Sequence, residues 1–158
     1  MYRQKSRIIE QIQSYHRQVA SLFFNLYQRI DDEEVRMIVH ELYEHERARE
    51  QYLDKYKKVA EAINLWLEFP CEKLSNQISE CFKGLDTEST LTVKGILNLE
   101  VHFDNCLIKL YNILSSEDAM SETVTNIFYY MLKKTKKEEE MLAKLLTNSE
   151  RDIHLHFV

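Results

Sequence analysis

The chain has 158 residues, enough for one domain with a single core, and its 2 glycines and 1 proline leave few residues for the turns of a sheet protein. Because 44% of the residues are hydrophobic and 30% are charged, we expect long helices and an all-α protein. The net charge of −5 argues against nucleic-acid binding, and no apolar run approaches the ~20 residues that span a bilayer.

Four segments carry apolar residues at three- and four-residue intervals, the period of one helical face. They predict helices over residues 4–30, 33–62, 90–115 and 121–147. Acidic residues from Asp31 to Glu34 suit the N-terminus of the second helix, and this tight joint makes the first two helices antiparallel. The chain therefore contains two predicted hairpins, 4–62 and 90–147, followed by an irregular tail, 148–158.

Residues 63–89 interrupt the pattern and include a short amphipathic helix from Cys71 to Phe82, which stops at Gly84. This segment is too apolar for a disordered tether, so we interpret it as a crossover between the hairpins of one domain, residues 1–158. The N-terminus lacks the apolar stretch of a signal peptide, which predicts a cytoplasmic protein. Cys71, Cys81 and Cys106 are then expected to be reduced structural thiols.

The two hairpins resemble each other. A shift of 88 residues aligns the apolar positions of the first and third helices, and a shift of 89 aligns those of the second and fourth. The near agreement of the two shifts indicates that the hairpins are copies. The alternative is that any two amphipathic helix pairs can be brought into partial register.

Polar residues interrupt the apolar faces at one level of all four helices. The shifts pair His16 with Asp104, Glu46 with Thr135, and Arg49 with Glu138. On the second helix, His40, Glu41, Glu44 and His45 form i,i+4 pairs, which we interpret as a solvated outer face.

The second helix reads Val35-x-x-Ile38-x-x-x-Leu42-x-x-x-Glu46-x-x-Arg49-x-x-Tyr52-Leu53, which resembles the rubrerythrin branch of the ferritin-like family. The likeness covers about residues 5–146. It implies a ferritin-like four-helix bundle of two hairpins joined by a long crossover, and a homodimer. In that family each hairpin supplies a Glu seven residues before an aromatic and a Glu-x-x-His pair, which together bind two irons.

Carried over to this chain, the aromatics Phe23 and Tyr111 place the first-helix ligands at His16 and Asp104. The Glu-x-x-His pairs correspond to Glu46 with Arg49 and to Thr135 with Glu138. Glu46 alone matches the family. Arg49 is always protonated and has no lone pair for a metal, so we do not expect an intact two-iron centre.

Two interpretations of these positions follow. In the first, Arg49 is neutralised by Glu46, Glu138 or Asp104 in a buried polar network, with no catalytic residues and no cofactor, and the protein has a structural or interaction role. In the second, one Fe, Mn or Zn ion is bound by four ligands, and the protein is an oxidoreductase or stores metal. The ligands would be His16, Glu46, Asp104 and Glu138.

Two further possibilities stay open from the sequence. A different helical register would turn Glu100 or Glu139 inward. The space between the helices could also hold a small molecule, although no residue in the sequence identifies the chemical class of that molecule.

Overall fold

The computed structural model describes residues 4–57, 71–88, 91–115 and 122–148, and within these ranges it contains helices and no strands. The helices are α1 (Gln4–Arg29), α2 (Glu33–Tyr52), α4 (Cys71–Cys81), α5 (Val93–Ser115) and α6 (Glu122–Asn148). The predicted all-α class is confirmed. Among these residues no helix is long and apolar enough to cross a membrane.

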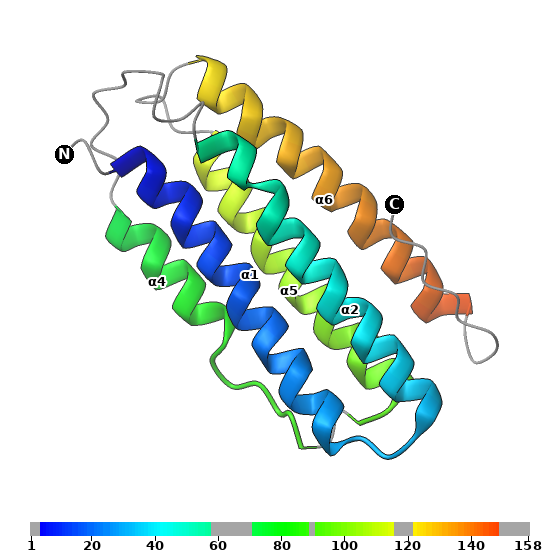
Figure 1. The fold of residues 1–158 in the computed structure, drawn as a ribbon. Coiled ribbons are helices and arrows are strands. Elements are labelled where there is room, and N and C mark those ends of the chain that lie inside the picture. Colours follow the sequence, from blue (N-terminus) through cyan, green and yellow to red (C-terminus); the bar gives the residue numbers. More distant parts are fainter. Residues whose placement is uncertain (1–3, 58–70, 89–90, 116–121, 149–158) are drawn as a thin grey trace.

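The helices pack in two close pairs, α1 with α2 and α5 with α6, and α2 contacts α5 (Figure 1). The short helix α4 lies along α1 and also contacts α5, which buries Leu74 and Ile78. The predicted short helix in the crossover is therefore part of the packed structure. Parts of the predicted boundaries, at 58–70, 89–90, 121 and 149–158, lie outside the described residues.

The core between α1 and α5 is rich in aromatic rings. Tyr15, Phe23 and Phe82 all pack against the ring of Phe103, with centroids 5.3 to 6.4 Å apart. The Tyr15 hydroxyl donates a hydrogen bond of 2.6 Å to the Phe103 carbonyl oxygen, so this buried phenol is paired. These contacts hold the two hairpins together just beside the polar level.

Side-chain caps explain where α2 and α5 begin. The Asp32 carboxylate accepts hydrogen bonds from the backbone N–H groups of Glu34 and Val35, at 3.0 and 3.2 Å, which confirms the predicted start of α2. The Thr92 hydroxyl accepts from the Gly95 N–H at 3.0 Å. This cap starts α5 at Val93, three residues later than we predicted.

The expectation of an unbroken second helix to residue 62 is wrong, because α2 ends at Tyr52 and the chain turns at Leu53. The Leu53 N–H donates to the Glu50 carbonyl, three residues back instead of four. From α1, the Gln13 amide donates to the same carbonyl at 2.9 Å and to the Asp54 carboxylate at 2.8 Å. This buried amide stabilises the break, and helical turns resume over 54–57.

Tyr15→Phe is expected to lower the free energy of unfolding by about 1 kcal/mol, because it removes a buried hydrogen bond without changing the ring. Tyr111→Phe is the matched control: Tyr111 is equally buried, but its hydroxyl has no hydrogen-bond partner among the described residues. Urea unfolding should show a loss for Tyr15→Phe and no loss for Tyr111→Phe. Equal losses would contradict the pairing of Tyr15.

Candidate functional site

The polar residues singled out in the sequence meet at one level inside the helices. Residues three or four apart share a helical face, so α2 directs both Glu46 and Arg49 inward and α5 directs both Glu100 and Asp104. His16 comes from α1 and Glu138 from α6. His16, Glu46, Glu100 and Asp104 are all buried.

Arg49 lies at the centre of this cluster with a side chain that is 10% exposed. Its Nη1 donates to Glu46 Oε1 at 2.8 Å and to Asp104 Oδ1 at 2.6 Å, and lies 3.4 Å from Glu100 Oε1. Its Nη2 donates to Glu138 Oε2 at 2.7 Å. The guanidinium therefore contacts all three carboxylates that the sequence offered as its partners, and a fourth.

Two histidines extend the network through Glu46 and Glu138. His16 Nδ1 lies 2.6 Å from Glu46 Oε2, and His45 Nε2 lies 2.8 Å from Glu138 Oε2. The interpretation of His45 as part of a solvated outer face is wrong, because its side chain is only 10% exposed and lies against Glu138. Thr135 is buried, but its hydroxyl donates to the Met131 carbonyl one helical turn back.

Glu100 is the residue that the family positions did not include. It lies four residues before Asp104 on α5 and is fully buried. Glu100 and Asp104 therefore both point inward, and they are not alternatives to each other. Glu139, the other alternative, is only partly buried. The apolar neighbours Leu99 and Val101, and Leu97 three residues before, were the available indication for Glu100.

Three of the four carboxyl groups, those of Glu46, Glu100 and Glu138, have a pKa that departs from its usual range. Burial works to raise the pKa of Glu46, but Arg49 and His16 outweigh it and hold that pKa well below its usual range. Burial likewise opposes the ionisation of Glu138, yet His45 and Arg49 lower its pKa to about 2. Glu100 differs, because burial and then the charges of Glu46 and Asp104 raise its pKa well above normal.

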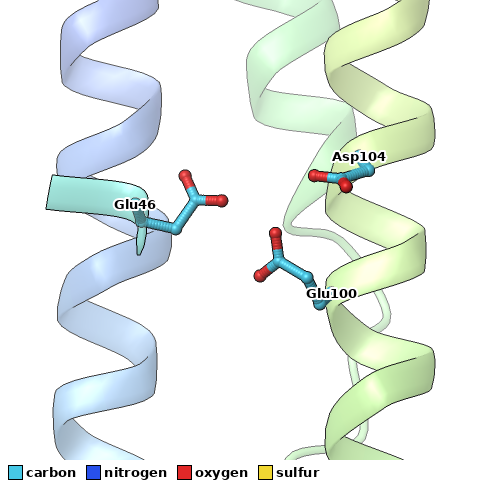
Figure 2. Close-up of side chains that lie close together, drawn as sticks. All are labelled: Glu46, Glu100 and Asp104. Carbon is cyan, nitrogen blue, oxygen red and sulfur yellow. The ribbon is translucent and has the colours of Figure 1, made fainter. Parts of the chain in front are cut away.

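Glu46, Glu100 and Asp104 form a group that could hold a metal ion, since one oxygen from each lies within 4.8 Å of the others. Figure 2 shows Glu46 on one helix facing Glu100 and Asp104 on the helix opposite. Glu100 Oε2 and Asp104 Oδ2 are buried and have no hydrogen-bond partner among the described residues. Of the four predicted metal ligands, Glu46 and Asp104 belong to this group, and His16 and Glu138 contact the network from outside it.

A cavity of about 160 Å³ adjoins Arg49. It is lined by polar side chains and by Leu107 and Met131, and its polar lining includes His16, His45, Tyr111, Thr135 and Glu138. The cavity is the space between the helices that could hold a small molecule.

The carboxyl groups with lowered and raised pKa can be distinguished at pH 7 by two substitutions, Glu46→Gln and Glu100→Gln. Glu46→Gln removes a charge bonded to both Arg49 and His16, so we expect a loss of about 3 to 5 kcal/mol in the free energy of unfolding. Glu100→Gln replaces a carboxyl whose raised pKa favours the neutral form, and should cost less than about 1 kcal/mol. Equal costs in urea unfolding would show that Glu100 is ionised in the folded protein.

Acid should destabilise the protein through Glu138. Its folded pKa of about 2 lies below the unfolded value of about 4.3, so its stabilisation is complete above the unfolded pKa and is lost as pH falls through the folded one. The loss between pH 5 and pH 2 should be on the order of 3 kcal/mol. Glu138→Gln should flatten this part of the stability profile, and an unchanged slope would argue against the pairing.

Comparison of the chain with protein-family models, with curated proteins and with solved structures found no match. The likeness to the rubrerythrin branch therefore depends on the residues quoted from the sequence. What it implies for fold and function is a proposal.

Proposed function

We propose that this protein is a ferritin-like four-helix bundle in which the Arg49 guanidinium takes the place of a metal ion, and that it has a non-catalytic structural or interaction role. The observation that carries the proposal is the bonding of Arg49 to Glu46, Asp104 and Glu138 at 2.6 to 2.8 Å. Arg49 stands where the resemblance calls for a histidine ligand. A side chain with five N–H donors and no lone pair binds the carboxylates that would otherwise bind metal.

The partners of the carboxylates support this role. Glu46, Asp104 and Glu138 are each paired with Arg49, and Glu46 and Glu138 also contact the imidazoles of His16 and His45. A divalent cation beside the guanidinium would be repelled by it.

Two contacts support the bundle of two similar hairpins. Tyr15 bonds to Phe103, and Arg49 bonds to Glu138. These partners are 88 and 89 residues apart, the same shifts that align the hairpins in the sequence. Residues near a two-fold axis contact their own equivalents, so both contacts are expected if the hairpins are related by an internal two-fold axis.

An interaction role needs an available surface. Phe24, Met37, Tyr129 and Tyr130 are large apolar side chains that are 45% to 68% exposed. The homodimer implied by the resemblance would bury part of this surface, and it belongs to the same proposal.

A second candidate function is a metal-dependent oxidoreductase or a metal-storage protein. It is favoured by the buried Glu100 and Asp104 oxygens that have no hydrogen-bond partner among the described residues. If Arg49 turned away, Glu46, Glu100 and Asp104 would offer three carboxylates with His16 nearby, a set suited to Fe, Mn or Zn. Such an ion would supply Lewis-acid or redox chemistry at the centre of the helices.

Metal content separates the two candidates. Protein produced with added iron and manganese should contain no stoichiometric metal by elemental analysis. Arg49→His restores the Glu-x-x-His spacing and removes the competing charge, so we expect this variant to gain metal and a Mn²⁺-dependent rise in Tm. Arg47→His, the same change at an exposed position on α2, is the matched control and should gain neither.

The second candidate predicts the opposite for the unaltered chain. Near-stoichiometric metal that disappears in Glu46→Ala would refute the replacement of metal by Arg49. Folding of each variant should be checked by far-UV circular dichroism, so that a loss of metal is not mistaken for a loss of structure.

A further inference from the structure

Cys81 and Cys106 bring two thiols together where α4 meets α5. The His102 Nε2 lies 2.7 Å from the Cys81 carbonyl oxygen and 3.8 Å from the Cys106 sulfur, so one ring atom contacts both residues. The Cys81 thiol donates to the Gln77 carbonyl oxygen at 3.2 Å, and the neighbouring Cys106 thiol, together with burial, raises the pKa of Cys81. Both cysteines are reduced in the structure.

Burial limits which reagents can reach this pair. Cys81 is 5% exposed and Cys106 is 8% exposed. Such low exposure favours a small oxidant over a bulky reagent. The third cysteine, Cys71, begins α4 and is separated from Cys81 by about 15 Å of helix.

We propose that Cys81 and Cys106 form a redox modification site for small hydroperoxides, closing to a disulfide that ties α4 to α5. The chemistry of this pair does not depend on the proposed function. It assigns a chemical role to two thiols that the sequence suggested were only structural.

The reaction balances with hydrogen peroxide as the oxidant. The Cys106 sulfur attacks one peroxide oxygen, the O–O bond breaks, and the products are Cys106 sulfenic acid and water. The Cys81 sulfur then attacks the Cys106 sulfur, the S–O bond breaks, and the thiol proton leaves with the oxygen as a second water. Two thiols lose two electrons in total, and one peroxide is reduced to two waters.

Closure would change how α4 is held. The buried residues of α4 pack on α1 and α5 without a covalent link other than the chain itself. A disulfide from the last residue of α4 to the middle of α5 would fix the position of this helix. Exposure to peroxide would therefore change how firmly α4 is held against α5.

The test uses the full chain with Cys71→Ser, which leaves only the proposed pair. The protein is treated with hydrogen peroxide, quenched, digested without reductant and analysed by mass spectrometry. We expect a mass loss of about 2 Da, a peptide that joins Cys81 to Cys106, and recovery of both thiols with dithiothreitol. Cys81→Ala and Cys106→Ala should each abolish the joined peptide, and in Cys81→Ala the Cys106 sulfur should carry added oxygen.

Exposed methionines provide an internal measure of the peroxide dose. Met37 is 68% exposed and Met141 is 40% exposed, so both should oxidise when the reagent is sufficient. Two free thiols that persist after both methionines have become sulfoxides would overturn the proposal. Because this result comes from a chain that retains both cysteines, it stands even if an alanine variant fails to fold.

Discussion

The buried charge of Arg49 is the constraint on which the rest of the structure depends. A guanidinium among helices must be paired with carboxylates, because an unpaired buried charge costs several kcal/mol. Here the partners come from α2, α5 and α6, and Glu46 in turn contacts His16 from α1. Each of the four long helices therefore contributes to neutralising the same site.

Apolar burial and the Arg49 network contribute differently to the structure. Burial of Leu, Ile, Val and aromatic side chains along the helices provides most of the driving force for folding. Such side chains tolerate small changes in helix register, whereas the Arg49 contacts of 2.6 to 2.8 Å do not. We infer that the network specifies how the helices align, in addition to any part it has in function.

Helices and their order could be predicted from the sequence because they depend on local patterns. Asp32 marks the start of α2 through a cap with its own neighbours, and the interrupted apolar faces located Arg49 and its acidic partners. The end of α2 was missed because Gln13, from a different helix, bonds to the backbone at the break. Glu100 was missed as a site residue for a related reason, since its inward direction depends on how α5 faces α2.

We infer that a guanidinium, and not a metal ion, occupies the space between Glu46, Glu100 and Asp104. Anomalous X-ray diffraction from crystals of protein produced with added iron and manganese tests this most directly. We expect planar density for Arg49 against these carboxylates, with no anomalous peak among them. A strong anomalous peak bound by Glu46, Glu100 and Asp104, with Arg49 turned outward, would contradict it.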